Sequence, residues 1–292
     1  MNLPLISSMN PIMSTYPTPS NPSSGVQTFT TPNKTWQIST RKLPILKAGP
    51  IEALNTRIGI PIPEMIFGDN YVRLTHVPSG WTLDFNAADA LDRVSKTEEG
   101  MLQVAVAEEW KETRKGQQEG IEGVVKKFDW SYSTDYRGTT TTAAAAEGKP
   151  GEEGWKDTTA ELSPIRTDLL SRPDPILFFD SVDLYEDELA DNGIALLAVK
   201  VRVMPERLLI LSRFFLRLDG VVVRLRDTRV YVEHATNRVV RQYTAKEEGY
   251  EVLQEKLRRT GVAGVAEALR DANVVGPLLR IVEEGTDVFE VG

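Results

Sequence analysis

The side chains that could do chemistry in this chain are carboxylates and arginines, because the sequence has no cysteine and only two histidines, His76 and His234. Without thiols there can be no disulfide, thiolate zinc site, iron–sulfur cluster or cysteine nucleophile. A serine–histidine triad would have to use one of the two histidines, and a two-histidine metal site would need both. Neither histidine lies in a recognisable motif, and an ordinary turn or surface position is the commoner role for each.

Motifs that bind cofactors are also missing from the sequence. It has no phosphate-binding glycine loop, zinc-ligand spacing, nucleophile elbow or calcium loop. Acidic pairs such as Asp183 with Asp187 are common, but acid–base catalysis needs a pocket that spacing alone does not define. We therefore predict no cofactor, no bound metal and no catalytic residue. These observations favour a binding protein over an enzyme.

Basic side chains gather in one segment, residues 200–241. This segment holds ten Lys and Arg residues and four Asp and Glu residues, whereas the whole chain of 292 residues has a formal net charge of −8. An acidic protein is not expected to be a general nucleic-acid binder, whose affinity rests on a basic surface. The local excess of arginine fits either a solvated sheet face, balanced by the acidic cluster at 180–188, or an interaction surface.

A long β-hairpin is predicted to position these arginines. Two apolar runs, at 207–218 and 221–233, lie on either side of the dipeptide Asp219-Gly220. Asp-Gly between apolar runs favours a two-residue type I′ turn, because it readily supplies the positive φ angles that this turn needs.

The predicted turn fixes the register of the hairpin. Leu225 and Asp227 then lie on the core face, and Arg213 lies directly opposite Arg226 on the other face. Like charges in that position destabilise a sheet. The register therefore calls for counter-charges, either from the rest of the chain or from a partner.

The chain as a whole predicts an α+β fold of antiparallel β-sheets with long hairpins, helices that cover one side, and a disordered N-terminal tail. Residues 1–34 form the tail and residues 35–292 a single domain, with a mobile low-complexity loop near 138–160. We expect further strands at 71–76, 81–85, 128–136 and 238–244, the last being the final strand, an edge strand or helix at 178–189, and helices at 49–55, 86–91, 105–114, 246–259 and 262–273. Neither a transmembrane-length apolar run nor a signal peptide occurs, so we expect a soluble intracellular protein with no membrane partner.

Several segments, taken in order, resemble the TIPRL family, also called the TIP forty-one-like proteins. The resembling segments are PEMIFGDNYVRL at 63–74, FNAADAL at 85–91, GMLQVAVAEEW at 100–110, DWSYSTDYRGT at 129–139, YEDELADNG at 185–193 and VKVRVMPERLLILSRFFLRLDGVVVRLRDTR at 199–229. The length of the last segment argues against chance similarity.

The resemblance implies a non-catalytic protein that binds the catalytic subunit of type 2A serine/threonine protein phosphatases and of their type 4 and type 6 relatives. It further implies a role in TOR signalling, a link to a regulatory partner called Tap forty-two or alpha-four, and a location in the cytoplasm and also the nucleus. An acidic phosphatase tail is expected to bind in a groove, a mode that suits an exposed basic sheet.

Position by position, the resemblance implies partner contacts at Asp89 in FNAADA, Ile165 in the Ile-Arg-Thr-Asp segment, and Leu225 and Asp227 in RLRDTR. Leu225 stands where some relatives have methionine, a change that conserves volume. Each residue also has a structural interpretation. Asp89 belongs in the first turn of a helix, Leu225 fits a core, and Asp227 could pair with Arg229.

Two other functions are compatible with the sequence. One is a hydrolase that uses carboxylates around Asp69 and Asp84, which would require a deep pocket with converging polar groups. The other is an adaptor that reads phosphopeptides with its arginines, which would require a phosphorylated ligand.

Overall fold

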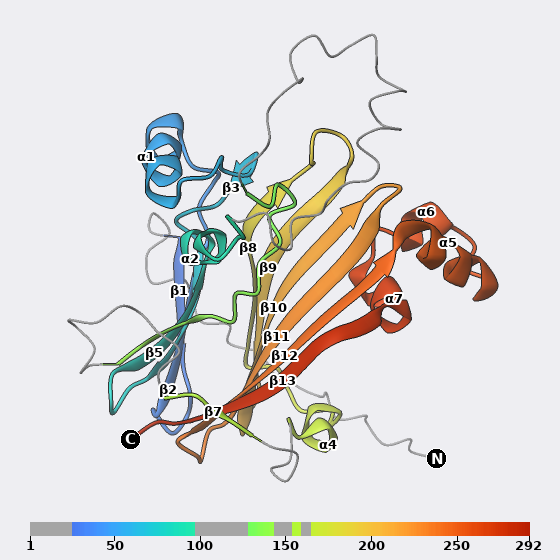
Figure 1. Cartoon of the computed structure of the whole chain (residues 1–292). Coiled ribbons are helices and arrows are strands. Elements are labelled where there is room, and N and C mark those ends of the chain that lie inside the picture. The colour runs from blue at the N-terminus through green and yellow to red at the C-terminus, as the bar shows by residue number, and fades with distance from the viewer. Residues whose placement is uncertain (1–24, 97–127, 143–153, 159–164) are drawn as a thin grey trace, which may run out of the picture.

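The computed structural model describes residues 25–96, 128–142, 154–158 and 165–292, which form two antiparallel β-sheets with short helices (Figure 1). The small sheet has the strand order β1-β2-β4-β5-β6, with β1 (Val26–Thr30), β2 (Trp36–Arg41), β4 (Tyr71–His76), β5 (Trp81–Asn86) and β6 (Thr139–Thr141). The large sheet has the order β3-β8-β9-β10-β11-β12-β13-β7, with β3 (Met65–Ile66), β8 (Phe178–Asp187), β9 (Gly193–Val203), β10 (Arg207–Leu218), β11 (Val222–Glu233), β12 (Arg238–Gly249), β13 (Arg280–Glu290) and β7 (Lys156–Asp157). The predicted fold class is confirmed.

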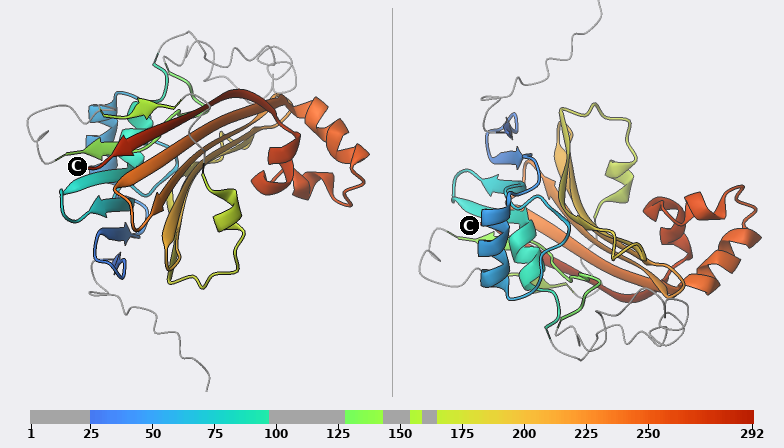
Figure 2. Two further views of the ribbon diagram at one scale, coloured as in Figure 1. Left: turned by 90° about the horizontal axis from the view of Figure 1, so that it is seen from below. Right: turned by 90° about the horizontal axis from the view of Figure 1, so that it is seen from above.

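The helices divide between the two sheets. They are α1 (Ala48–Ile58), α2 (Ala87–Asp92), α4 (Thr167–Leu170), α5 (Tyr250–Arg259), α6 (Val265–Ala268) and α7 (Ala272–Val275), followed by the 3-10 turn η2 (Gly276–Leu278). Helices α4 and α5–α7 lie on one side of the large sheet, and the small sheet lies on the other (Figure 2). We call the side toward the small sheet the inner face and the side with α4 and α5–α7 the outer face.

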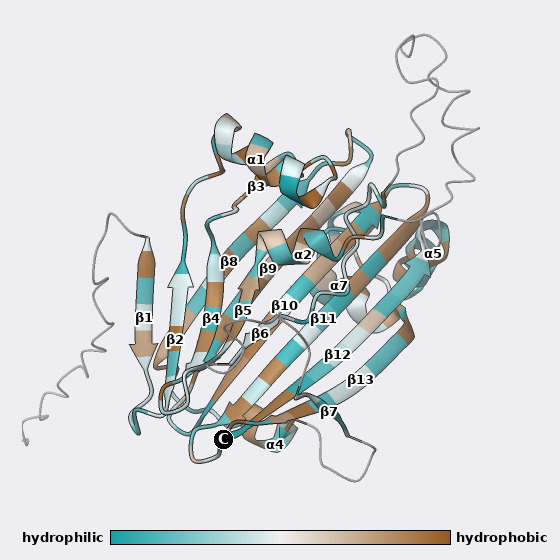
Figure 3. Ribbon diagram, turned by 60° about the vertical axis from the view of Figure 1, so that its left-hand side comes forward, coloured by the Kyte–Doolittle hydropathy of each residue, from teal (hydrophilic) through white to brown (hydrophobic). Residues whose placement is uncertain are grey.

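The main hydrophobic core fills the space between the two sheets. Buried residues alternate with more exposed ones along β9, and bands of high and low hydropathy mark the long strands β9–β12 (Figure 3). Trp36 and Phe85 of the small sheet and Phe214 of the large sheet are buried to 1% exposure or less. The outer face is apolar where it is covered, at the clusters around Leu225 and Ile165.

The β10–β11 hairpin differs from its predicted register by one residue. Leu218 pairs with Val222, so the connection contains three residues and not two. Val221 N–H donates to Leu218 O at 3.0 Å, and Gly220 has a φ of 75°. A three-residue loop with its glycine in the left-handed region is the next most common hairpin connection after the two-residue turn.

This shift moves every side chain of β11 to the other face. Leu225 and Asp227 therefore lie on the outer face and not on the core face as predicted. Arg213 pairs with Asp227, and Arg226 pairs with Phe214 on the inner face. The predicted pair of Arg213 with Arg226 is not formed, and the counter-charge of Arg213 is Asp227 of the same hairpin.

The segment at 128–136 was predicted as a strand but forms an irregular path across the inner face. Asp129 bends the chain, because its carboxylate accepts from Ser131 N–H at 3.0 Å and its carbonyl from Tyr132 N–H at 3.0 Å. Tyr132 has a φ of 54°, which no strand tolerates. Its carbonyl accepts from the Tyr185 hydroxyl at 2.9 Å, so the alternating aromatics are anchored by side chains of the large sheet and not by strand pairing.

The C-terminal part also differs from expectation. Strand β12 extends to Gly249, so α5 begins at Tyr250, and the second predicted helix is split into α6 and α7. The strand at 238–244 is not the last, because β13 follows the helices and pairs with β12. Residues 280–284 of β13 are all exposed, so this part of the strand has no buried face that would require alternating apolar residues in the sequence.

The described residues also bear on the predicted boundaries. Strand β1 begins at Val26, within the segment assigned to the tail. Strands β6 and β7 fall within the predicted loop at 138–160. The segment at 178–189 is strand β8, and the predicted helix at 105–114 lies outside the described residues.

Candidate functional site

The outer face of the large sheet carries an ion cluster around Asp227. Arg213 donates two hydrogen bonds of 2.8 Å to the two oxygens of Asp227, and Arg229 donates a third at 3.0 Å. The Asp227 side chain is 5% exposed, whereas those of Arg213 and Arg229 are 22% and 36% exposed. Burial alone would lower the pKa of Arg213, but the hydrogen bonds and charge of Asp227 raise it overall. Asp227 is therefore an enclosed anion between two cations.

Leu225 lies beside this cluster under the C-terminal helices. It is 3% exposed and packs with Phe215, Leu253 and other apolar side chains of the second core cluster. The chain approaches closely just after α7, because a Cβ atom at Gly276, the first residue of η2, would lie 3.0 Å from Leu225 Cδ2. Leu225 thus fixes where α7 sits on the sheet, and the structural interpretation of this residue applies.

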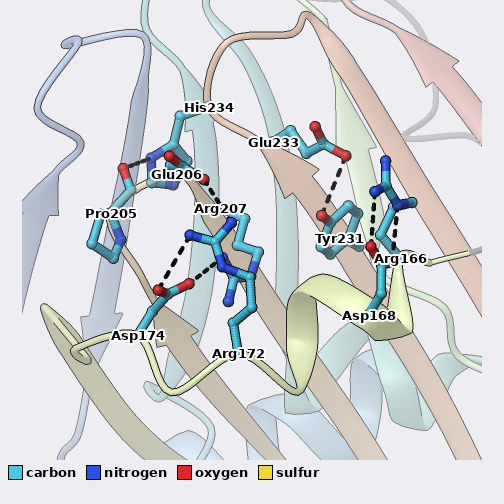
Figure 4. Close-up of polar contacts among 10 residues, drawn as sticks. All are labelled: Arg166, Asp168, Arg172, Asp174, Pro205, Glu206, Arg207, Tyr231, Glu233 and His234. Carbon is cyan, nitrogen blue, oxygen red and sulfur yellow. Dashed lines mark hydrogen bonds and ion pairs between the residues drawn. The ribbon is translucent and has the colours of Figure 1, made fainter.

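Ile165 lies at the opposite end of the outer face. It is 5% exposed and packs with Tyr231 and Val240 in a third apolar cluster. The segment that follows, through α4 to Asp174, is tied to the start of β10 by polar contacts (Figure 4). Arg172 contacts both Asp174 and Glu206, and the 1%-exposed Arg207 contacts Asp174 at 2.6 Å.

Between these two helical covers the sheet is open. We call this open part the outer strip and define it by one central region of β9–β12: Ala198, Lys200, Leu211, Arg213, Asp227, Arg229, Gln242 and Thr244. All of these residues except Asp227 are at least partly exposed. Helix α7 closes one end through Asn273, whose amide oxygen accepts from Arg213 at 2.8 Å.

The charge of the outer strip is mainly positive. Lys200, Arg213 and Arg229 face one enclosed acid, Asp227, and the exposed Arg202 lies in the next position along β9. Acids appear at the rims, where Asp183 of β8 pairs with Ala198 and Glu284 of β13 pairs with Thr244. Within the described residues, Lys200 and Arg202 make no ion pair. The described part of the chain therefore neutralises only part of the arginine surface expected from the sequence.

Asp89 lies apart from this face, near the small sheet. It occupies the first turn of α2, where the side chain of the N-cap Asn86 accepts from its N–H at 2.9 Å. Its carboxylate accepts from Asn86 Nδ2 at 2.8 Å and from Thr139 Oγ1 at 2.6 Å. The predicted helix-opening role is thus present, and the side chain remains half-buried at the surface.

Asp89 lines a cleft of about 370 Å³ together with Asp69 and Asp84, the two carboxylates of the hydrolase alternative. Burial raises the pKa of Asp84, although Arg73 donates to its carboxylate at 2.6 Å and opposes this effect. Arg41 and Arg73 also line the cleft. No group of three His, Asp or Glu residues in the described part of the chain is arranged to hold a metal ion.

The structure places three of the four residues implicated by the resemblance on the outer face. Asp227 belongs to the outer strip, Leu225 and Ile165 lie at its two ends, and Asp89 does not reach it. Sequence reasoning named Arg229 only as an ion-pair partner of Asp227 and missed Arg213 and Asn273 as parts of this site. A three-residue connection at Asp219-Gly220-Val221 would have placed Arg213 opposite Asp227, so the signal for Arg213 was present in the turn.

Comparison with known proteins bears on the same elements. The model of the family described as "TIP41-like family" matches residues 65–254, which include β3–β12 and the whole outer strip. The chain belongs to the TIP41-like family. The resemblance found in the sequence is thereby confirmed.

Several TIP41-like relatives align over most of the chain. The human "TIP41-like protein" is 42% identical over 213 residues, which cover 73% of this chain and 74% of the relative. The "Type 2A phosphatase activator TIP41" of Saccharomyces cerevisiae is 37% identical over 270 residues, covering 87% and 73%. The "Type 2A phosphatase activator tip41" of Schizosaccharomyces pombe is 32% identical over 240 residues, covering 82% and 89%.

None of the described helices is long and apolar enough to span a membrane.

Proposed function

We propose that this TIP41-like chain regulates type 2A serine/threonine phosphatases by binding their catalytic subunit, without catalysing a reaction itself. The names of the two yeast relatives, which describe them as type 2A phosphatase activators, support this role. The single structural observation that carries it is the outer strip, an exposed basic sheet face bounded by Ile165 and Leu225. Such a face suits an acidic segment of a partner, because complementary charge steers and orients association.

Finer parts of the proposal rest on the family resemblance. They are binding to type 4 and type 6 catalytic subunits, action in TOR signalling in the cytoplasm and nucleus, and joint action with the Tap forty-two or alpha-four protein. Asp89 is proposed as a second, separate contact on the opposite layer of the molecule. A partner that reached both sites would have to extend around one end of the two sheets, since α2 and the outer strip belong to different layers (Figure 2).

A binding role is preferred over the hydrolase alternative. The carboxylates of Asp84 and Asp89 in the cleft are engaged by Arg73, Asn86 and Thr139. A general acid or base needs a proton-transfer position open to substrate. These contacts instead suit carboxylates that hold β5, β6 and α2 together.

Calorimetric titration of the purified chain with type 2A, type 4 and type 6 catalytic subunits tests the proposal. We expect one-to-one binding to the type 2A subunit, and weaker binding when Asp89→Ala removes the small-sheet contact. Asp92→Ala is a matched control, because Asp92 is 68% exposed at the end of the same helix. Folded protein that binds none of the three subunits would contradict the proposal.

A further inference from the structure

The position of Asp227 limits what this residue can do at a binding face. A carboxylate offers about four acceptor positions, and three of them here receive N–H groups from Arg213 and Arg229. The side chain is 5% exposed. A partner that contacted Asp227 directly would have to displace a guanidinium from a bidentate pair, which leaves a cation unpaired and is costly.

Arg229 has the opposite character. It is 36% exposed and uses one of its five N–H donors on Asp227. Arg213 is less available, because it donates twice to Asp227 and once to Asn273. Of the two arginines in the ion cluster, Arg229 is the more exposed and has more unused donors.

The contact with Asp227 also restricts the motion of Arg229. An arginine side chain loses conformational entropy when it is fixed in one arrangement. The contact with Asp227, which is itself held by Arg213, imposes part of this loss before any partner binds. The positions paired with Arg229 on the two adjacent strands, Leu211 and Gln242, are uncharged, so no acid there competes for the guanidinium.

We infer that Asp227 is a positioning residue, and that the guanidinium of Arg229, which it holds in place, contacts a carboxylate in an acidic peptide segment of the partner. This inference rests on the proposed function and assigns its contact atoms. It places the binding group one position beyond Asp227 on the outer face of β11. It also explains how an enclosed aspartate can matter for binding.

A carboxylate fits this site better than a phosphate. A planar guanidinium pairs with a carboxylate through two parallel N–H···O bonds, as Arg213 already does with Asp227. A phosphate dianion would favour a second cation with free donors at the same point. Arg213 is the nearest cation, but three of its donors are used by Asp227 and Asn273. Lys200 on β9 is two strands away from Arg229, which corresponds to roughly 9–10 Å between strand axes.

Binding of the type 2A catalytic subunit to four variants tests the inference: Arg229→Gln, Arg229→Lys, Asp227→Asn and the double variant Arg229→Gln/Asp227→Asn. We expect Arg229→Gln to raise Kd about tenfold or more, the size of a lost charge-assisted hydrogen bond. Arg229→Lys should recover part of the lost affinity, because it keeps the positive charge but not the paired N–H donors of the planar guanidinium. The double variant should bind no more than about twofold more weakly than Arg229→Gln, since coupled residues are not additive.

Two controls separate positioning from folding. Arg258→Gln removes one charge from an arginine that is 58% exposed on α5, and it should leave Kd within about twofold of the wild-type value. Thermal unfolding of each variant shows whether weaker binding reflects loss of structure, and Arg229→Gln keeps the test usable if Asp227→Asn does not fold. Removal of all phosphate from the subunit should leave binding unchanged.

Several outcomes would overturn the inference. The first is a normal Kd for Arg229→Gln together with a raised Kd for Asp227→Asn. The second is a Kd of the double variant that is raised by the product of the two single-variant factors. The third is binding that disappears when the subunit is dephosphorylated. The first two would make Asp227 a direct contact, and the third would make the ligand a phosphate. Failure of the wild-type chain to bind would instead contradict the proposed function itself.

Discussion

Arg213 and Asp227 face each other across β10 and β11, and two hydrogen bonds of 2.8 Å join the guanidinium to the carboxylate. The pair depends on one extra residue in the hairpin connection. A two-residue turn would have placed Arg213 against another arginine, which destabilises a sheet. The observed register replaces this repulsion with a bidentate ion pair and presents Arg229 beside it.

Removal of the carboxylate should destabilise the fold. Asp227→Ala leaves Arg213, 22% exposed, without its bidentate partner, and we expect a loss of about 2–3 kcal/mol in the free energy of unfolding. Urea denaturation measures this loss. Asp168→Ala is the control, because Asp168 is 62% exposed in its pair with Arg166 and should cost less than about 1 kcal/mol. Equal effects of the two substitutions would show that the Asp227 pair adds little.

Leu225 should tolerate methionine but not alanine. Met conserves volume against α7 and should cost less than about 1.5 kcal/mol, whereas Leu225→Ala should cost about 2–4 kcal/mol because a cavity opens beneath Gly276. Chemical denaturation gives both values. If Leu225→Ala proved as stable as the wild-type chain while binding was lost, Leu225 would be a direct contact and not a support for α7.

Gly193, at the start of β9, should be sensitive to any side chain. Its φ is 154°, and a Cβ atom would lie 1.9 Å from the carbonyl oxygen of Arg217 on β10. Gly193→Ala should therefore cost about 3 kcal/mol or more, because two paired strands would have to separate. Gly285→Ala on β13 is the matched control, since nothing lies within 4 Å of the added atom. Similar stabilities for the two variants would mean that β9 and β10 pair differently.

Stability should fall as the pH decreases below the ordinary histidine pKa. Burial lowers the pKa of His76 and of His234, so both bind protons more weakly in the folded chain than in the unfolded chain. The contribution of the two histidines to the free energy of unfolding is complete above the unfolded pKa of about 6.5 and decreases as the pH falls below it. Asp84 and Glu186, whose pKa values are raised by burial, act in the opposite sense but at lower pH.

The unfolding midpoints are compared at about pH 7.5 and pH 5.5, on either side of the unfolded pKa of histidine. We expect a lower unfolding midpoint at the acidic value for the wild-type chain. The His76→Gln/His234→Gln variant should show a smaller difference. A pH dependence of the same size in that variant would assign the effect to other groups.

Sequence reasoning found the parts of this fold that depend on local pattern. The long strands β10 and β11, the β4–β5 hairpin and the α2 N-terminus at Asn86 all follow from alternation or capping chemistry. The prediction failed where a single residue or a tertiary contact decides. The choice between two and three residues after Leu218 reversed both faces of β11, and β13, which is exposed over residues 280–284, carries no apolar periodicity.

The candidate site shows the same division. The residues around Asp227 could be named from the sequence, because the basic segment and the family resemblance both point to them. The burial of Asp227, Leu225 and Ile165 could not be predicted. The enclosure of Asp227 depends on the hairpin register, and the other two are buried by packing between segments that are distant in the chain. Because all three are buried, we propose that they act as supports and not as direct contacts.

The most direct test of the central claim, that the outer strip binds the phosphatase catalytic subunit, uses the lack of cysteine in this chain. A single introduced cysteine can be labelled selectively with a fluorophore. Lys200→Cys places the label in the outer strip, and Val77→Cys places it on an exposed turn of the small sheet, at a residue that is 49% exposed. Collisional quenching by iodide is then measured before and after the type 2A catalytic subunit is added.

We predict that the bound subunit shields the label at position 200 and leaves the label at position 77 as accessible as before. Binding that shields position 77 and not position 200, or binding that shields neither, would contradict the account.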